Sequence, residues 1–218
     1  MIKIDDFEAV IFDLDGTLID SMGMWKEIDE EYLGGLGIEV PERIQRDLEG
    51  LSYHETAVYF KKRFNLKDDL DTIKSDWHRM SHDKYVYELQ FKEGAAEFLA
   101  DLNDRGIKCG IASSNSRQLI EETLLRRGLM KYIQAISTCD DVGKNKPEPD
   151  VYLYAAKLLG ASPEKCLVFE DVPMGITAGK NAGMRTAAIY DEYSKEVENE
   201  KKELADHYLI SFKERFYE

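Results

Sequence analysis

Short, mostly apolar runs recur along this chain of 218 residues, and each is followed by polar residues and then by a segment with helical spacing. The first run is Ala9 to Phe12, and later ones lie at 107–112, 135–136, 166–169 and 186–189. A short apolar run without polar alternation is typical of a strand that is buried on both faces of a parallel sheet. Strands of this kind that alternate with helices predict an α/β fold with a Rossmann-like parallel sheet.

Apolar residues at helical spacing fill the segments between these runs. Helices are predicted at 95–104, 116–127, 150–159 and 172–182, and residues 208–210 predict a small strand at the edge of the sheet. The charged stretch at 192–206 is expected to be a solvated helix and loop with no function of its own.

Residues 21 to about 90 interrupt the alternation, because they show helical periodicity and no convincing strand. We therefore expect two domains: a sheet-based core formed by residues 1–19 and 91–218, and an all-helical domain formed by residues 20–90. Helices are predicted within this insertion at 25–33, 41–48, 52–64 and 68–87.

The charge balance narrows the classes of partner. There are 43 Asp and Glu residues against 29 Lys and Arg, which gives a formal net charge of -14. Such a chain repels nucleic acid and anionic membranes, and it can bind a small anion only where a local cation reverses the sign. The sequence has no apolar run approaching a membrane span and no signal peptide, so we expect a cytoplasmic protein that does not bind membranes. Its three cysteines, Cys109, Cys139 and Cys166, are widely spaced and are expected to be reduced.

Two carboxylates follow the first apolar run directly. Asp13 and Asp15 lie two residues apart where the strand is expected to end, and Gly16 allows the backbone to turn there. In an open α/β sheet this is the edge at which ligands bind. Two neighbouring carboxylates repel each other unless a cation or a shared proton lies between them. The pair therefore indicates a metal site or an acid/base pair, with a simple surface turn as the alternative.

Polar residues also follow two later runs and occupy one loop. The second run ends in Ser113 and Ser114 just before a helix, whose free N–H groups suit a phosphate. Lys146 lies in a loop stiffened by two prolines, and the fourth run ends in Glu170 and Asp171. Carboxylates at these strand ends could hold Mg²⁺, and Lys146 and the Ser113 hydroxyl would then surround a phosphoryl group.

In chain order these segments resemble the motifs of the haloacid dehalogenase-like hydrolase superfamily. The insertion is similar to the helical cap of the subgroup that contains phosphoglycolate phosphatase and β-phosphoglucomutase. The residues that carry the resemblance are Asp13-Leu14-Asp15-Gly16-Thr17, Ser113, Lys146 before Pro147-Glu148-Pro149-Asp150, and Glu170-Asp171 with Gly175.

The resemblance implies a role for each carboxylate. Asp13 would be the nucleophile that forms an aspartyl-phosphate, and Asp15 would protonate the leaving oxygen and then activate water. Asp13, Asp171 and the main-chain carbonyl of Asp15 would bind Mg²⁺, with Glu170 as a further ligand or one that acts through water. Because a halide leaving group needs no proton, the presence of Asp15 favours phosphoryl transfer over dehalogenation.

The resemblance also implies the residues that bind the phosphate. Lys146 would neutralise the phosphate and the nucleophile, and Ser113, Ser114 and nearby backbone amides would hold an equatorial oxygen. The cap would close over a small soluble phosphate ester and select the leaving group, with hinges near residues 19–21 and 89–94. An active site covered in this way needs no second subunit, so we expect a monomer.

Three functions compete at this stage. A phosphatase of a small phosphorylated metabolite is favoured over a β-phosphoglucomutase-like mutase. The Glu49–Ser52 stretch resembles the mutases, but Trp25 and Tyr53 stand near the positions where those enzymes have His and Arg. Trp25, Tyr53 and His54 are our candidates for substrate contact. A catalytically inactive binding protein on the same fold is the third reading.

The histidine pair His78 and His82 has the spacing of two metal ligands on one helix face. No third ligand lies nearby in the sequence, so the favoured interpretation is an exposed surface pair.

Overall fold

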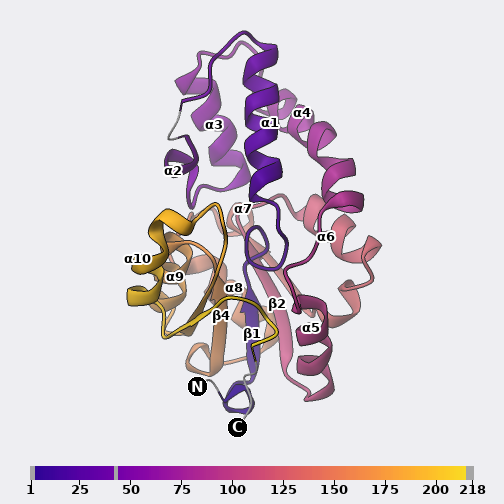
Figure 1. Cartoon of the computed structure of the whole chain (residues 1–218), viewed down its shortest axis with the longest axis vertical. Coiled ribbons are helices and arrows are strands. Elements are labelled where there is room, and N and C mark those ends of the chain that lie inside the picture. Colours follow the sequence, from indigo (N-terminus) through magenta and orange to yellow (C-terminus); the bar gives the residue numbers. More distant parts are fainter. Residues whose placement is uncertain (1–2, 42–43, 215–218) are drawn as a thin grey trace.

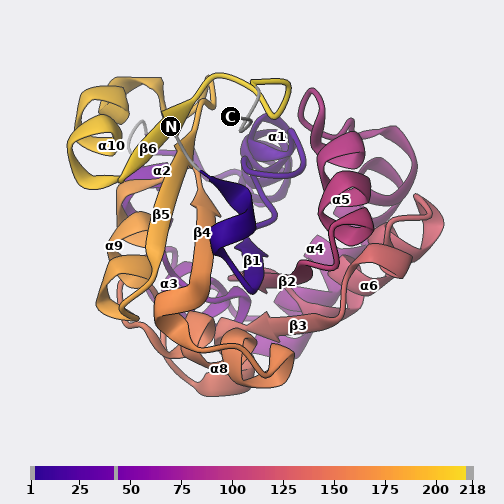
Figure 2. The ribbon, with the colours of Figure 1, turned by 90° about the horizontal axis from the view of Figure 1, so that it is seen from below.

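The computed structural model describes residues 3–41 and 44–214. In this part of the chain six parallel strands form one sheet in the order β3-β2-β1-β4-β5-β6, which confirms the predicted α/β fold. The central strand β1 therefore lies between β2 and β4 (Figure 2). The strands are β1 (Ala9–Phe12), β2 (Lys108–Ser113), β3 (Ala135–Thr138), β4 (Cys166–Glu170), β5 (Arg185–Ile189) and β6 (His207–Leu209).

Both faces of the sheet are covered, which explains the unbroken apolar run in β1. Val10 and Phe12 belong to one hydrophobic cluster. In this cluster the ring centroids of Phe12 and of Phe98 in α5 (Ala95–Asp104) are 6.1 Å apart. Ala9 and Ile11 belong to a second cluster, with residues of α8 (Asp150–Leu159). Successive side chains of a strand point to opposite faces, so an apolar residue is needed at every position. The helices α6 (Arg117–Arg126) and α9 (Pro173–Asn181) also flank the sheet.

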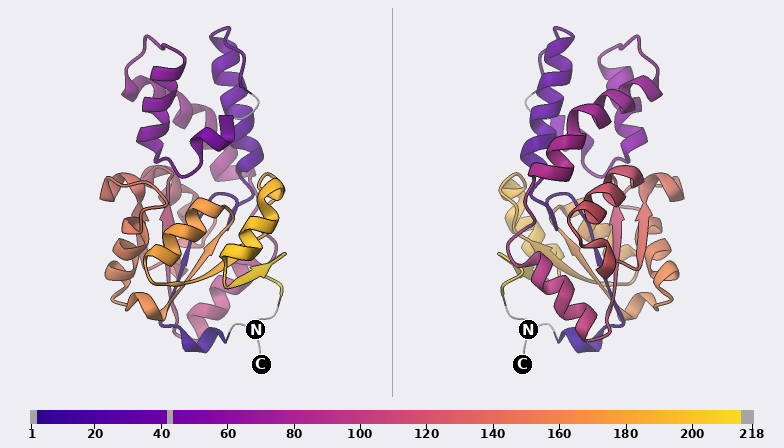
Figure 3. Two further views of the ribbon diagram at one scale, coloured as in Figure 1. Left: turned by 90° about the vertical axis from the view of Figure 1, so that its left-hand side faces the viewer. Right: turned by 90° about the vertical axis from the view of Figure 1, so that its right-hand side faces the viewer.

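Helices between β1 and β2 form a separate layer beyond one end of the sheet (Figures 1 and 3). We call residues 22–88 the helical block. The predicted helix at 68–87 is α4 continued by a π-helical turn. The predicted helix at 41–48 is described only from Ile44, because residues 42–43 lie outside the described residues. The elements of the block are α1 (Met22–Gly35), α2 (Ile44–Leu48), α3 (Tyr53–Arg63), α4 (Leu70–Asp83) and the π-helix Lys84–Glu88.

Two linkers connect the helical block to the sheet, and they run side by side. Ile19 forms an antiparallel bridge with Phe91. The amide of Lys92 donates to the Leu18 carbonyl at 2.8 Å, and the amide of Asp20 donates to the carbonyl of residue 90 at 3.0 Å. The chain therefore leaves the sheet and returns to it through one paired crossing, at the positions predicted as hinges.

Segment 192–206 forms the predicted helix and loop and is mostly exposed, but Ser194 and Lys201 within it are buried. Lys201 of α10 (Glu198–Leu204) is fully buried, and its ammonium donates to Ser194 Oγ at 2.7 Å and to the Ile189 carbonyl at 3.2 Å. A lysine can be buried because its stem is apolar and its head finds oxygen partners. The remaining short elements are the 3₁₀ turns Ile4–Asp6, Met130–Tyr132, Pro163–Lys165 and Lys195–Val197, and the helix α7 (Cys139–Val142).

The cysteines are free and buried, as expected of reduced residues. Among the helices of the described residues, none combines the length and the apolar character needed to cross a membrane.

Candidate active site

The carboxyl ends of β1, β4 and β2 place the predicted site residues at one edge of the sheet. Asp13 follows β1, Glu170 ends β4, and Asp171 comes next. Carboxylate oxygens of these three buried residues lie within 4.8 Å of one another. In the described part of the chain this is the only such group of three or more metal-ligating side chains. The pairing of β1 with β4 thus brings together groups about 157 residues apart in the chain, since Asp13 and Glu170 end neighbouring strands.

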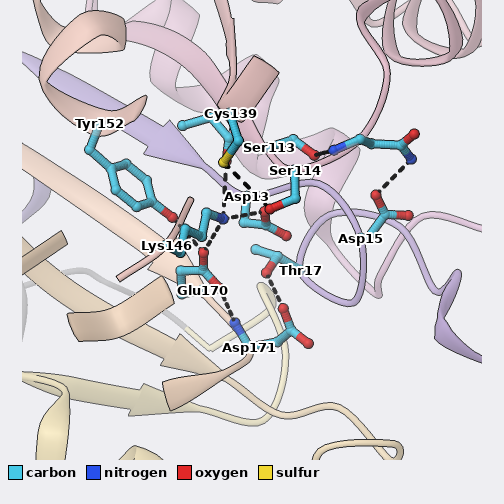
Figure 4. A network of polar contacts seen from close by, with 12 residues as sticks. Asp13, Asp15, Thr17, Ser113, Ser114, Cys139, Lys146, Tyr152, Glu170 and Asp171 are labelled. Carbon is cyan, nitrogen blue, oxygen red and sulfur yellow. Dashed lines mark hydrogen bonds and ion pairs between the residues drawn. The ribbon is translucent and has the colours of Figure 1, made fainter. Parts of the chain in front are cut away.

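On a chain with a net negative charge an anion can bind only beside a local cation, and Lys146 supplies that cation. Its buried ammonium donates to Asp13 Oδ1 at 2.7 Å and to Glu170 Oε1 at 2.5 Å (Figure 4). Burial alone would lower the pKa of this ammonium, but the charges of Asp13 and Glu170 outweigh burial and hold the pKa well above its usual value. Lys146 is therefore charged at neutral pH.

The acidic cluster suits a divalent cation. Burial raises the pKa of Asp13, and the neighbouring Glu170 and Asp15 raise it further against the opposing effect of Lys146. Burial and the charges of Glu170 and Asp13 likewise raise the pKa of Asp171. Three buried carboxylates against one ammonium leave an excess of negative charge, and hard divalent cations prefer such oxygen donors. The residues present therefore fit Mg²⁺.

Two residues that the sequence analysis did not select hold the carboxylates in place. The Tyr152 hydroxyl of α8 donates to Glu170 Oε1 at 2.5 Å, and the Thr17 hydroxyl donates to Asp171 Oδ1 at 3.0 Å (Figure 4). Thr17 belongs to the first motif and could have been chosen. No motif pointed to Tyr152, because an aromatic residue at helical spacing is typical of a hydrophobic core.

Gly175 is required by the position of Glu170. A Cβ atom on Gly175 would lie 1.9 Å from Glu170 Oε1, well inside any allowed contact. Gly16 is constrained in a similar way, because its φ is +76° and a Cβ there would lie 2.3 Å from Asp171 Oδ2. Each glycine leaves room for one of the carboxylates.

Gly175→Ala is expected to displace the Glu170 carboxylate from Lys146 and Tyr152. The free energy of unfolding should fall by about 1–3 kcal/mol, because an overpacked buried group must shift and lose hydrogen bonds. Chemical denaturation measures it. The control is Gly34→Ala in α1, where a Cβ meets no atom within 4 Å. This control should stabilise the helix by up to about 1 kcal/mol. Equal stability of Gly175→Ala and wild type would contradict the prediction.

Asp15 contacts residues of both layers. Its Oδ1 accepts hydrogen bonds from Ser21 Oγ at 2.6 Å, Tyr85 OH at 2.7 Å and Trp25 Nε1 at 2.9 Å. Its Oδ2 accepts one from Asn115 Nδ2 at 2.9 Å. Figure 4 shows Asp15 to one side of the group formed by Asp13, Lys146 and Glu170. Donors from the first linker, the helical block and the loop after β2 therefore fix this side chain together.

The two serines at the end of β2 lie beside the acidic cluster. Ser113 is buried, and its Oγ accepts a hydrogen bond from the Asn115 amide at 3.0 Å. The Ser114 carbonyl accepts one from the Tyr53 amide at 2.8 Å, which joins the sheet to the start of α3.

A cavity of about 290 Å³ separates the strand ends from the helical block. His54 is exposed and does not line the cavity. Tyr193 and Glu196, from the charged segment 192–206, do line it. The predicted site residues that line the cavity are Asp13, Asp15, Trp25, Tyr53, Ser113, Ser114, Lys146, Glu170 and Asp171.

His78 and His82 lie away from this cavity. Their Nε2 atoms are 3.9 Å and 3.5 Å from Glu122 Oε2 of α6. Within the described residues these three side chains do not form a metal-ligating group. Both rings are partly exposed, in keeping with the surface interpretation.

The family model for haloacid dehalogenase-like hydrolases matches residues 10–189. The chain therefore belongs to the haloacid dehalogenase-like hydrolase family.

Curated relatives and solved structures agree with this assignment. The chain is 31% identical over 177 residues to a phosphorylated carbohydrates phosphatase of Thermotoga maritima, covering 81% of this chain and 82% of the relative. It is 32% identical over 182 residues to a bifunctional riboflavin kinase/FMN phosphatase of Arabidopsis thaliana, covering 83% of this chain and 48% of that protein. The crystal structure of CbbY from Rhodobacter sphaeroides, in complex with phosphate, superposes with a TM-score of 0.82 at 25% identity, covering 95% of this chain and 96% of CbbY.

Proposed function

We propose that this protein is a magnesium-dependent phosphatase that hydrolyses a small phosphorylated metabolite through an aspartyl-phosphate intermediate. The observation that carries the proposal is the buried Lys146 ammonium bonded to Asp13 and Glu170, beside Asp171, at the floor of a cavity. This set combines a carboxylate nucleophile, donors for a metal and a fixed cation for the phosphate. The phosphatase names of the relatives support the reaction class but differ in substrate.

In the first step an Asp13 oxygen attacks phosphorus, and the bond from phosphorus to the leaving oxygen breaks. Asp15 gives a proton to that oxygen, which leaves as an alcohol. In the second step water attacks phosphorus, and Asp15 takes its proton. Phosphate is released, and the Asp13 carboxylate is regenerated.

The residues around the cavity supply charge and donors for these steps. Asp13, Asp171, Glu170 and the main-chain carbonyl of Asp15 would hold Mg²⁺, which when bound neutralises charge on the phosphoryl oxygens. Lys146 offsets negative charge on the nucleophile and on the phosphate. The hydroxyls and amides of residues 113–114 would hold an equatorial oxygen, since such donors stabilise charge best when fixed in advance.

The helical block is proposed to be a cap domain of residues 20–90 on a core of residues 1–19 and 91–218. Three of the four donors to Asp15 come from the first linker or the block, namely Ser21, Trp25 and Tyr85. Closing the cap would therefore position the acid/base group as well as exclude water. A cap of this kind covers the site within one chain, so a monomer remains our expectation.

A β-phosphoglucomutase-like mutase remains the second candidate, because a putative β-phosphoglucomutase from Thermotoga maritima is 28% identical over 95% of this chain with a TM-score of 0.69. The test is phosphate release from a panel of small phosphate esters with and without Mg²⁺, with β-glucose 1-phosphate included. Mg²⁺-dependent release supports the phosphatase. Conversion of β-glucose 1-phosphate to glucose 6-phosphate without net release would establish the mutase.

Mg²⁺ is expected to raise Tm more at about pH 7.5 than at about pH 5. The raised pKa values of Asp13 and Asp171 mean that the metal-free folded protein keeps protons that the unfolded chain has released. Stability from these groups is thus present at low pH and is lost as the pH rises through the folded pKa values. Mg²⁺ offsets that loss at neutral pH, whereas protons compete with it in acid.

Thermal scans with and without Mg²⁺ at both pH values measure this difference, and Asp171→Asn is expected to shrink it. An equal rise in Tm at both pH values would contradict binding at this cluster.

A further inference from the structure

Three aromatic rings, from three helices of the block, line the cavity. Trp25 comes from α1, Tyr53 from the first residue of α3, and Trp77 from α4. The ring centroids of Trp25 and Tyr53 are 6.5 Å apart, and those of Tyr53 and Trp77 are 5.8 Å apart. We call these three residues the aromatic wall. The rings meet edge to face, as aromatic side chains do when they pack together.

The polar tips of two of these rings are already occupied. Trp25 Nε1 donates to Asp15 at 2.9 Å, and the Tyr53 hydroxyl donates to the Lys74 carbonyl at 3.1 Å. Both residues therefore offer a ligand the apolar bodies of their rings.

Two charged residues on the same side of the cavity are also engaged. Arg46 pairs with Glu196 at 2.9 Å, and Glu49 accepts a hydrogen bond from the Met174 amide at 3.2 Å. A leaving group covered with hydroxyls would lose water where it lies against the rings of the wall, at a cost for each unpaired hydroxyl. A planar ring with few polar atoms would lose less and would gain contact with the wall.

The third ring also packs into the core of the block, with its centroid 4.9 Å from that of Phe60 and 5.9 Å from that of Tyr32. Trp77 is 3% exposed, and its Nε1 has no hydrogen-bond partner among the described residues. This nitrogen is shielded from solvent, so Trp77 offers a ligand only the apolar part of its ring.

We propose that the substrate is a phosphate ester whose leaving group ends in a planar aromatic or heteroaromatic ring, packed on Trp25 and Tyr53. This inference rests on the proposed function for the phosphate end of the cavity. It sets a size limit as well, because a cavity of about 290 Å³ is at the small end of ligand pockets and would take a leaving group of about nucleoside size at most.

AMP and ribose 5-phosphate are matched probes, because both carry a 5-phosphate on ribose and AMP has adenine where ribose 5-phosphate has a hydroxyl. Their dissociation constants are measured by calorimetry on Asp13→Asn with Mg²⁺, which does not depend on turnover. AMP is expected to bind about five-fold or more tightly, since base–aromatic stacking contributes at least that factor. Equal binding, or tighter binding of ribose 5-phosphate, overturns the inference.

Turnover by the wild type separates the two proposals. If the ring packs on the wall, kcat/KM should favour AMP over ribose 5-phosphate by a similar factor, and the reverse order would count against the ring preference. Failure to release phosphate from any phosphate ester or from the anhydride acetyl phosphate would refute the phosphatase, while the two dissociation constants would still decide the ring preference.

Tyr53→Leu locates the preference in the cavity. This change removes one ring of the wall and should bring the ratio of the two dissociation constants several-fold closer to one. Tyr59→Leu is the matched control, because Tyr59 lies on the same helix, outside the cavity lining, with its hydroxyl bonded to Asp47. Inorganic phosphate binding by both variants reports whether the phosphate end is still folded. An unchanged ratio in a Tyr53→Leu protein that binds phosphate would overturn the assignment.

Discussion

Asp13→Asn is expected to lower Mg²⁺-dependent phosphate release by about 10⁴-fold or more, the scale seen when a covalent nucleophile is removed. An amide oxygen is a poor nucleophile, and it also binds a divalent cation less well than a carboxylate. Single-turnover and steady-state release from a small phosphate ester measure the effect. Asp104→Asn, an exposed change at the far end of α5, is the control and should retain wild-type activity.

The same variant should remain folded. Asparagine can still accept the hydrogen bond from Lys146, and the change removes a buried charge whose pKa is already raised by burial. In the absence of Mg²⁺ its Tm should therefore equal or exceed that of the wild type. Activity within ten-fold of wild type would show that Asp13 is not the nucleophile.

Lys146→Met is expected to be among the most destabilising single changes in the chain. It leaves the Asp13 and Glu170 carboxylates buried without the ammonium that bonds to both. Removing one partner of a buried ion pair costs about 3–5 kcal/mol. Denaturation without Mg²⁺ near neutral pH measures this loss, and phosphate release should also fall, by about 10²-fold or more.

The loss of stability should shrink in acid. Lys146 opposes the other influences that raise the pKa of Asp13, so that pKa should rise further in its absence, and a proton can then replace the missing charge. Lys157→Met, an exposed change on α8, is the control and should have little effect. If Lys146→Met were no less stable than Lys157→Met at neutral pH, the ion pair would not contribute to the fold.

The fold and the floor of the site could be predicted because their signals are local. Each carboxylate follows an apolar run directly, and parallel strands place such positions at one edge of the sheet. Asp13, Glu170 and Asp171 are therefore recognisable without knowledge of their distant contacts. The positions of the helices between the strands could be predicted for the same reason, through their apolar spacing.

The surroundings of Asp15 and Glu170 could not be predicted in this way. Tyr85 and Asn115 reach Asp15 from 70 and 100 residues along the chain. Tyr152 contacts Glu170 from a helix on which its spacing is that of an ordinary core residue. Lys201 was misjudged because a charged stretch predicts exposure, whereas its apolar stem and two oxygen partners allow burial.

The paired linkers have a consequence for how such an enzyme could change over time. Because Ile19 and Phe91 are bridged, the points where the chain leaves the sheet and returns to it lie side by side. Any helical segment whose two ends are equally close could be grafted between them without altering β1, β2 or β4. Lineages could thus exchange the part that faces the leaving group while inheriting the phosphate-binding part intact. A chimera made by swapping residues 20–90 between two relatives should fold, and its substrate preference should follow the donor of that segment.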